Sequence, residues 1–274
     1  MKPFRDRLAL HTWTLDTTPL ADVLRVAQQA GWNAVELRRV DFTRGYDAGL
    51  TNEQVLALVR ASGLKVGIVG TEYGLLFAQG AELKRLFDVL AQTCANAVAL
   101  GCNMLMLAPG PNTGTVAEAA ANLRTAGEIV QAHGVRLALE FSAGHDVINH
   151  LAVARDIIAR ANHPHCGLLL DAYHLERTGG GGRGFAGVAS EEIFAFQYSD
   201  VPPTPLTGDR RPVDRLAPGK GVIPWGDVLG LLREKGYAGY LSYEAPNPAH
   251  WSRPPLEVAR EGVECMRALL AGNE

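Results

Sequence analysis

Clustered basic residues, long apolar runs and paired cysteines are all missing from this 274-residue sequence. The net charge of −3 and the lack of a Lys- or Arg-rich run argue against a nucleic-acid partner, because binding to a phosphate backbone needs clustered positive charge. No stretch approaches the roughly 18 apolar residues that span a membrane, and the N-terminal apolar segment is too short for a signal peptide. We therefore expect a soluble, cytoplasmic protein without a membrane partner.

The four cysteines, Cys94, Cys102, Cys166 and Cys265, lie far apart and form no CxxC pair. Cys94 and Cys166 fall in segments predicted as helix or strand, which favours buried free thiols. Histidine is also scattered: the residues at positions 145, 150, 163, 165 and 250 have no metal-ligand spacing. We expect the thiols to be free and these histidines to lie on the surface.

The sequence is rich in short apolar runs that are regularly interrupted. Hydrophobic residues make up 47% of the chain and charged residues 20%, which suits one large α/β domain. Eight runs have the pattern of buried strands: 8–11, 34–37, 65–69, 104–107, 135–139, 168–170, 193–196 and 240–243. Amphipathic helices are predicted between and after them, at 20–30, 51–62, 81–100, 115–133, 149–161, 224–235 and 256–270. This alternation predicts a single-domain (β/α)8 TIM barrel over residues 1–274.

Four of the predicted strands stop at a residue that has a side-chain oxygen. They end at Glu140, Asp171, Gln197 and Glu244, which are separated by 31, 26 and 47 residues. A barrel of roughly 250 residues uses about 31 residues per strand–helix unit, so these residues are expected at the ends of consecutive strands. A Pro-rich excursion, residues 201–222, accounts for the longest step. We expect the four side chains to converge on one rim of the barrel.

Three carboxylates and one amide oxygen on one rim favour a bound divalent cation. Such donors suit Mg²⁺ or Mn²⁺ best, with Co²⁺ or Zn²⁺ as alternatives. A cation with open coordination positions can chelate a carbonyl and a neighbouring hydroxyl, and so stabilise the enediolate formed when the adjacent carbon loses a proton. A carboxylate beside the ion can act as the base. For each residue taken alone, strand-end capping or a surface salt bridge is the better explanation, and the four residues at the expected intervals together favour the metal site.

Residues after other strands are candidates for the wall of the site. His11 and Trp13 lie at the C-terminal end of the first strand, and Glu72 and Tyr73 follow the third. His11 either lines the pocket or forms a hydrogen bond within the barrel mouth. Trp13 and Tyr73 form either an apolar wall against a sugar ring or ordinary aromatic packing, and Glu72 is a candidate polar contact to substrate. The glycine-rich segment Thr178–Gly187 is either an active-site lid or a loose connection.

Six motifs together resemble one family of enzymes. They are AGWNAVELR (30–38), LALEF (137–141), LLLDAYH (168–174), FQYSD (196–200), DRLAPGKGVIPW (214–225) and GYAGYLSYE (236–244). In this combination the chain resembles, nearly from end to end, the xylose-isomerase-like TIM barrels. That family includes sugar and sugar-phosphate isomerases and epimerases, inosose-processing enzymes and 3-dehydroshikimate dehydratases.

The resemblance implies roles for five residues. Glu140, Asp171 and Glu244 match metal ligands, and Glu140 and Glu244 also match the acid/base pair of the epimerases. His174 matches a contact to a substrate oxygen beside the metal. Arg215 matches an arginine that reaches the substrate.

Gln197 departs from the family pattern, because many sugar epimerases have histidine at the matching position. Glutamine is neutral and cannot be a general acid or base, but its amide oxygen can still bind a metal. The substitution favours Mg²⁺ or Mn²⁺ over Zn²⁺, and it also resembles the dehydroshikimate dehydratases. Glu36 matches a residue of the barrel interior, which we take as structural.

The resemblance implies a metal-dependent isomerase or epimerase that acts on a small polyhydroxy carbonyl compound. A lyase of the dehydroshikimate dehydratase type is the alternative, because both reactions begin with loss of the same kind of proton. The negative net charge and the missing histidine at position 197 disfavour a metal-dependent endonuclease, and the intact acidic residues disfavour a non-catalytic sugar-binding barrel. Apolar positions on the outer helices are compatible with a homodimer or homotetramer.

Overall fold

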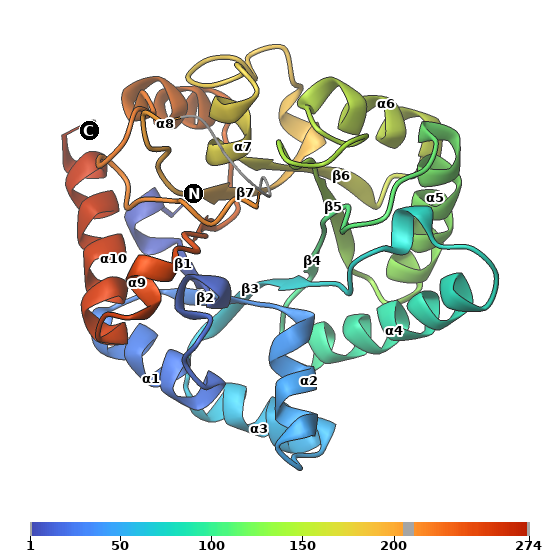
Figure 1. Cartoon of the computed structure of the whole chain (residues 1–274), viewed down its shortest axis with the longest axis horizontal. Helices are drawn as coiled ribbons and strands as arrows, with labels where there is room; N and C mark the ends of the chain where they lie inside the picture. The colour runs from blue at the N-terminus through green and yellow to red at the C-terminus, as the bar shows by residue number, and fades with distance from the viewer. Residues whose placement is uncertain (1, 205–210, 273–274) are drawn as a thin grey trace.

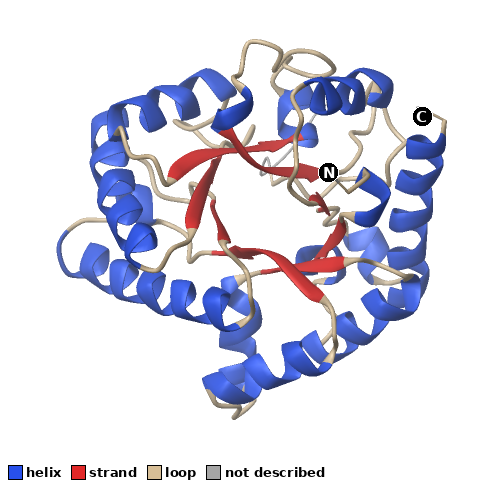
Figure 2. Ribbon diagram, turned by 180° about the vertical axis from the view of Figure 1, so that it is seen from behind, coloured by secondary structure: helices blue, strands red, loops and turns tan. Residues whose placement is uncertain are grey.

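Eight parallel strands, each paired with the next in chain order and the last paired with the first, close into a barrel. In the computed structural model of the chain, which describes residues 2–204 and 211–272, helices form an outer ring around these strands (Figure 1). The view from behind shows the same two layers, with the strands as the inner ring (Figure 2). The predicted (β/α)8 barrel is confirmed.

The strands lie within two residues of their predicted positions. They are β1 Leu8–His11, β2 Ala34–Leu37, β3 Lys65–Gly70, β4 Met104–Leu107, β5 Arg136–Glu140, β6 Cys166–Asp171, β7 Ile193–Tyr198 and β8 Leu241–Tyr243. The helices are α1 Leu20–Ala30, α2 Arg39–Asp47, α3 Asn52–Ala61, α4 Gly80–Ala99, α5 Val116–Ala132, α6 Leu151–Ala161, α7 Ala172–Arg177, α8 Trp225–Glu234, α9 Pro248–Trp251 and α10 Pro255–Ala271. Short 3₁₀ segments lie at Phe4–Asp6, Thr12–Leu15, Leu75–Phe77 and Ser190–Glu192.

The strands are buried because helices cover their outer faces and side chains fill the barrel. Every residue of β1, β2, β4 and β6 is buried, as expected of a parallel sheet enclosed by helices. The longer helices pack through an apolar stripe, which in α1 includes Val23, Leu24 and Ala27. Gly31 ends α1 at φ 84°, a left-handed conformation that favours glycine.

Three helices, α2, α7 and α9, are absent from the sequence-based prediction. The buried residues of α2 are Asp41 and Phe42, too few for a periodic apolar pattern. Its start is set by Asp41, whose Oδ2 accepts a hydrogen bond from the backbone N–H of Arg38 at 2.7 Å. Similarly, α7 begins where Asp171 Oδ1 accepts from the Tyr173 backbone N–H at 2.9 Å. A side-chain carboxylate therefore caps the start of each of these two helices. A search for hydrophobic periodicity does not detect such helices.

The glycine-rich segment Thr178–Gly187 is packed against the outside of the barrel. Phe185 within it and Val188 just after it are buried. Lys235, which follows α8, donates hydrogen bonds to the backbone carbonyls of Ala186 and Val188. The structure therefore favours a connection over a lid.

One buried carboxylate, that of Asp200, holds the Pro-rich excursion after β7. Its oxygens accept hydrogen bonds from the backbone N–H groups of Gly219 (2.7 Å) and Ile223 (3.0 Å), and from Trp225 Nε1 (2.9 Å). Asp200 thereby fixes the chain from the turn at Gly219 to the start of α8. Part of the predicted excursion, residues 205–210, lies outside the described residues.

Replacing this carboxylate should destabilise the protein. Asp200→Asn keeps the shape but turns one accepting oxygen into a donor, so we expect a loss of about 2–4 kcal/mol in the free energy of unfolding. Urea unfolding followed by circular dichroism measures the loss. The control is Asp156→Asn, an exposed residue paired with Arg160 at 2.9 Å, which should cost less than about 0.5 kcal/mol. Equal stability of the two variants would contradict the role of Asp200.

Candidate metal centre and its cleft

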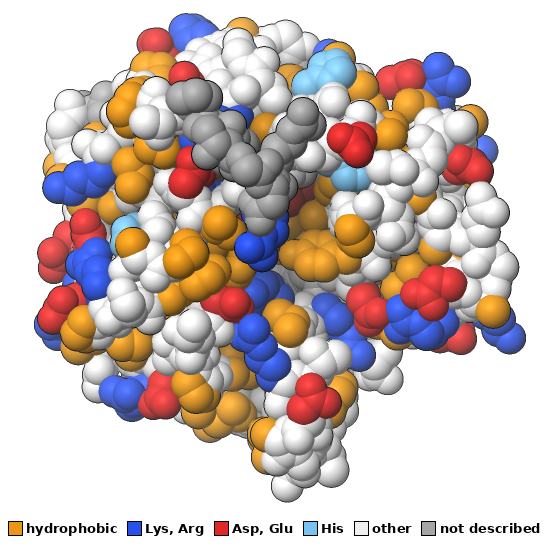
Figure 3. All heavy atoms as spheres, viewed as in Figure 1, with side chains coloured by type: hydrophobic (Ala, Val, Ile, Leu, Met, Phe, Trp, Pro, Cys, Tyr) orange, Lys and Arg blue, Asp and Glu red, His pale blue; other side chains and the backbone are white. Residues whose placement is uncertain are grey.

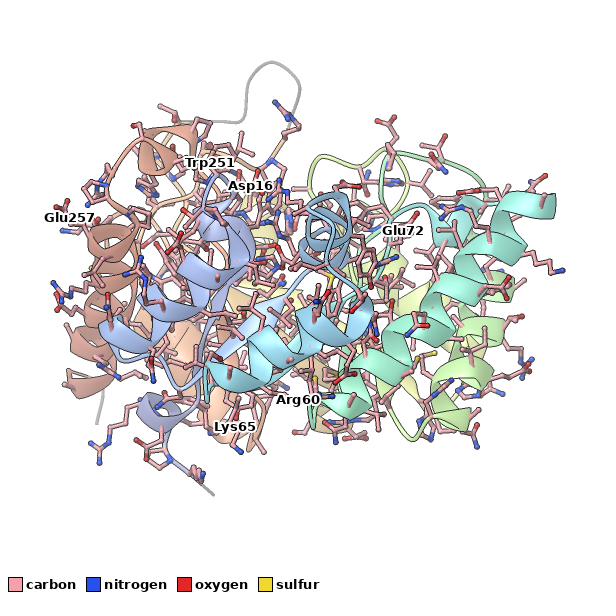
Figure 4. All side chains as sticks on the ribbon, turned by 90° about the horizontal axis from the view of Figure 1, so that it is seen from below. Asp16, Arg60, Lys65, Glu72, Trp251 and Glu257 are labelled. Carbon is pink, nitrogen blue, oxygen red and sulfur yellow. The ribbon has the colours of Figure 1, made fainter. Side chains whose placement is uncertain are left out.

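The candidate ligands lie at the carboxyl end of the barrel strands. Figure 4 shows Asp16, which follows β1, and Glu72, which follows β3, toward one end of the molecule. Lys65, the first residue of β3, lies toward the opposite end in the same view. Functional groups of (β/α)8 barrels are carried at the carboxyl end, so the site is expected at the end with Asp16 and Glu72.

The structure brings the four predicted metal ligands to this end. Glu140 ends β5, Asp171 ends β6, Gln197 lies near the end of β7, and Glu244 directly follows β8. Asp171 is in register with Gln197, and the backbone N–H of Glu244 donates to the Tyr198 carbonyl, which joins β8 to β7. All four side chains belong to residues that are at most 5% exposed.

Part of this cluster has the geometry of a cation site. One potential ligand atom from each of Glu140, Asp171 and His174 lies within 4.8 Å of the others, and Glu244 is not part of that group. Glu140 Oε1 and Gln197 Oε1 are buried and have no hydrogen-bond partner within residues 2–204 and 211–272. An unpaired buried acceptor costs about 1–3 kcal/mol, and a coordinated divalent ion would satisfy both oxygens.

The third member of that group, His174, is placed to donate a hydrogen bond, which leaves Glu140 and Asp171 as the metal-ligating members of the group. Its Nδ1 accepts from the backbone N–H of Ala143 at 3.2 Å, so Nε2 carries the hydrogen of the neutral ring. Nε2 also lies 3.6 Å from Glu140 Oε1 and 3.2 Å from Arg215 Nη2, while Nη1 and Nε of that guanidinium donate to Asp171 Oδ2 and to the Pro212 carbonyl. Burial lowers the pKa of His174 to about 3, which keeps the ring neutral. This tautomer agrees with the predicted contact to a substrate oxygen.

Arg215 is fully buried between two of the predicted metal ligands. Its Nη1 lies 2.6 Å from Asp171 Oδ2 and 3.1 Å from Glu244 Oε2. The next residue, Leu216, forms a backbone bridge with Asp200, so the excursion described above also positions this arginine. The resemblance implies that Arg215 reaches the substrate. The structure places it in the wall of the cleft, and it also serves as a fixed cation for the acidic cluster.

Four buried carboxyl groups form an acidic cluster, and three of them, those of Glu140, Asp171 and Glu244, act on the Arg215 guanidinium. Burial, together with the neighbouring carboxylates, raises the pKa of Glu140 well above its usual range. Burial also raises the pKa of Glu36 to about 8, and it raises the pKa of Glu244 to about 7 against the opposing effect of Arg215. Asp171 completes the cluster. The cluster therefore carries more potential negative charge than Arg215 offsets, and either protons or a divalent cation must supply the rest.

Glu36 and His11 hold two of the ligands in place. Gln197 Nε2 donates to Glu36 Oε1 at 2.9 Å, which leaves the amide oxygen of Gln197 free. His11 Nδ1 accepts from the backbone N–H of Trp13 at 3.0 Å, so its Nε2 carries the hydrogen and faces Glu244 Oε1 at 3.2 Å. The structural role predicted for Glu36 thus includes the orientation of Gln197. The sequence contains no signal for that contact.

The cleft has two lobes that share a wall of Trp13, Tyr73 and Met106. The inner lobe, about 370 Å³, is lined by Glu140, His174, Arg215 and Glu244 together with loop residues between 108 and 113 and between 142 and 146. The outer lobe, about 460 Å³, is lined by His11, Asp16, Arg38, Arg39, Val40, Thr43, Arg44, Gly70, Thr71 and Glu72. Figure 3 shows a hollow near the middle of one face, with Lys and Arg side chains beside it. A larger cavity of about 660 Å³, at the amino ends of the strands, contains none of the candidate residues.

The remaining predicted residues also line the cleft. Trp13 lies in the wall common to both lobes, and His11 and Glu72 line the outer lobe. The prediction that His145 lies on the surface is wrong, because its ring stacks on Phe77 and the residue is buried in the wall of the inner lobe. The spacing of the histidines along the chain does not indicate whether a given histidine is buried.

Within residues 2–204 and 211–272, no helix has the length and apolar content of a membrane span.

The chain belongs to the family described as xylose isomerase-like TIM barrel, which matches residues 24–269. It is 30% identical over 135 residues to an inosose isomerase of Halalkalibacterium halodurans; the match covers 48% of this chain and 47% of that protein, so the chain spans about half the length of this curated relative. It is 28% identical over 186 residues to a 3-dehydroshikimate dehydratase of Pseudomonas aeruginosa, covering 67% of this chain and 28% of that protein.

A solved structure supports the fold. The crystal structure of the IOLI protein with a zinc atom matches with a TM-score of 0.85 and 20% identity, and the match covers 98% of this chain and 99% of that chain. At this identity the likeness shows the barrel and not the reaction.

The pKa of Glu36 predicts how stability depends on pH. In metal-free protein, a folded-state pKa of about 8 against an ordinary 4.5 means that Glu36 contributes stability below pH 4.5 that is lost as the pH rises through 8. Glu36→Gln removes this contribution. The free energy of unfolding of the variant relative to wild type should therefore rise by on the order of 2–4 kcal/mol between pH 4.5 and 8. Urea unfolding at several pH values tests this, and a pH-independent difference would contradict it.

The metal preference should depend on residue 197. Gln197→His replaces a hard oxygen donor by an imidazole nitrogen, so we expect the ratio of Zn²⁺ to Mg²⁺ affinity to rise by about tenfold or more. Isothermal titration of EDTA-treated protein measures both affinities. Gln29→His, on α1 outside the cleft, is the control and should leave the ratio unchanged. An unchanged ratio in Gln197→His would mean that Gln197 is not a ligand.

Proposed function

We propose that this protein is a divalent-metal-dependent isomerase or epimerase that moves a proton at the carbon beside a carbonyl group of a polyhydroxy compound. The observation that carries the proposal is the convergence of Glu140, Asp171, Gln197 and Glu244 at the carboxyl end of the barrel, with two of their oxygens unpaired. The curated relatives named inosose isomerase support the same class of reaction.

The oxygen-rich donor set of Glu140, Asp171, Gln197 and Glu244 would hold Mg²⁺ or Mn²⁺, with Zn²⁺ or Co²⁺ as alternatives. A bound ion of this kind supplies Lewis acidity at a carbonyl oxygen. The remaining chemistry belongs to the side chains around it.

Two carboxyl groups in different surroundings form the proposed acid/base pair. Glu244 lies between the Nε2–H of His11 and the guanidinium of Arg215, two groups that favour its carboxylate form and so suit a base. Glu140 has a more strongly raised pKa and an unpaired oxygen, so it is suited to carry the proton. One group can remove a proton while the other returns it. A metal bound beside them would lower both pKa values together.

Other side chains position the substrate. The Nε2–H of His174, fixed by the bond from Ala143 to its Nδ1, donates to a substrate oxygen beside Glu140. Trp13 and Tyr73 form the shared wall of the two lobes and would contact the ring or chain of a sugar. These contacts hold the reacting carbon near the two carboxyl groups, and this orientation lowers the activation barrier to proton transfer.

A dehydratase is the second candidate, and two observations favour it. Gln197 stands where many sugar epimerases have histidine, and a relative of this chain is named 3-dehydroshikimate dehydratase. The first step is the same loss of a proton beside a carbonyl. A β-hydroxyl would then leave as water, and the proton it needs would come from Glu140 or through His174.

Removing either carboxyl group should stop proton exchange. In D₂O, with Mg²⁺-loaded protein and a panel of ketoses, keto-inositols and 3-dehydroshikimate, proton NMR should show deuterium entering beside the carbonyl of at least one compound. We expect Glu140→Gln and Glu244→Gln to reduce that rate by about a thousandfold, because each keeps its size and loses a base. Glu264→Gln, exposed on α10, is the matched control and should exchange like wild type.

The products separate the candidate reactions. A reversible stereoisomer or positional isomer identifies the isomerase, and new aromatic or vinylic protons identify the dehydratase. Wild-type exchange in both variants would contradict the assigned roles. Metal-bound wild-type protein without exchange on any compound would favour a sugar-binding barrel without catalysis.

A further inference from the structure

The outer lobe is the basic part of the cleft. Its wall carries Arg38, Arg39 and Arg44 against Asp16 and Glu72. The outer lobe shares a wall with the inner lobe, so one molecule can extend from the candidate metal centre into it.

Two of the arginines are already paired. Arg38 Nη1 lies 2.8 Å from Asp16 Oδ1, and its Nη2 lies 3.4 Å from Asp41 Oδ1. Arg44 Nη1 lies 3.1 Å from the same Asp16 oxygen and donates to the backbone carbonyl of Asp16 at 2.8 Å. Two guanidinium groups and two carboxylates balance one another here.

Arg39 is paired incompletely. Its Nε is buried and has no hydrogen-bond partner in the described part of the chain. Glu72 Oε2 is 3.8 Å away, an ion-pair distance that is too long for a hydrogen bond, and the guanidinium carbon lies 5.5 Å from the centre of the Tyr46 ring. Glu72 also accepts a hydrogen bond from Arg85, which in turn pairs with Glu82 at 2.7 Å. Arg39 therefore keeps an unfilled donor in the wall of the outer lobe.

Thr71 provides a second unfilled group beside Arg39 on the rim. Arg39 follows β2 and Thr71 follows β3, and these two strands are neighbours. The Thr71 hydroxyl is buried without a partner among the described residues, and only 6% of the residue is exposed. Its backbone is fixed by a hydrogen bond to the Met106 carbonyl at 2.9 Å. The oxygens of an anionic group would satisfy both donors.

We infer that the outer lobe binds a carboxylate group of the substrate through Arg39 and Thr71, while the hydroxycarbonyl end of the same molecule lies at the candidate metal centre. This rests on the proposed function, because it assigns the two ends of one substrate to the two lobes. One incompletely paired guanidinium matches a single negative charge better than the roughly doubled charge of a phosphate ester. The substrate class is therefore a polyhydroxy oxo-acid.

Binding of an unreactive acid tests the inference without turnover. The probes are shikimate, a hydroxylated ring carboxylate that has no ketone, and its uncharged methyl ester. Ligand-detected NMR titration of Mg²⁺-loaded protein gives both affinities. We expect wild type to bind the acid about tenfold or more tightly than the ester, because a charge-assisted hydrogen bond is lost in the ester.

Variants of Arg39 and Thr71 test whether these two residues cause the tighter binding of the acid. Arg39→Gln should reduce the affinity for the acid by about tenfold and leave that for the ester nearly unchanged, and Thr71→Val should reduce it by a smaller factor. The control is Arg60→Gln, on α3, whose Nη1 is paired with Glu53 at 2.6 Å and which Figure 4 shows toward the other end of the molecule. It should bind both probes like wild type. Metal affinity should be the same in all four proteins.

Three results would overturn the inference: equal binding of acid and ester by wild type, a preference for the acid that survives Arg39→Gln, or no binding of either probe. The outcome is separable from that of the proposed function. Deuterium exchange on neutral ketoses without a preference for the acid would leave the proposed function standing and remove the carboxylate site. A preference for the acid that depends on Arg39, without deuterium exchange on any compound, would support the carboxylate site and contradict the proposed function.

Discussion

Buried acidic side chains crowd together at the carboxyl end of the barrel, and the rest of the site depends on how their charge is balanced. Glu140, Asp171 and Glu244 repel one another, and burial removes the water that would screen them. Arg215 offsets part of this charge, and the N–H of neutral His11 faces Glu244. Protons or a divalent cation must supply the remainder. A closed barrel can hold this arrangement because every strand is hydrogen-bonded on both sides, which fixes the backbone positions of the strand ends.

The position of Arg215 is itself determined by a second buried carboxylate, that of Asp200. Asp200 collects backbone and indole N–H groups from Gly219, Ile223 and Trp225, and it bridges to the residue after Arg215. A long excursion with little regular structure thus delivers a cation to a fixed point in the barrel mouth. The strands hold the acidic groups, and the excursion after β7 supplies their counter-charge.

Much of the candidate site is predictable because its signals are local. Asp171 ends an apolar run, and regular strand–helix spacing places such ends on one rim, as the structure confirms. The outer lobe is not predictable in this way. Arg39 begins a helix with too few apolar residues for a periodic pattern, and the importance of Thr71 depends on a hydroxyl that no neighbour satisfies. His145 is buried through stacking on a distant phenylalanine, which its sequence neighbourhood does not reveal.

The sequence alone determines the order of the strands, the closed barrel and the set of polar strand ends. Each strand and helix is visible in a local apolar pattern, and the regular spacing of these patterns matches a (β/α)8 barrel. The tertiary structure decides which atoms of those residues face the cleft. Gln197 presents its amide oxygen because Glu36, 161 residues away, accepts from its nitrogen. His174 presents Nε2–H because Ala143 occupies its other nitrogen, and Arg215 serves as counter-ion because the excursion folds back over the mouth. Contacts of this kind depend on three-dimensional packing, and no local pattern in the chain encodes them.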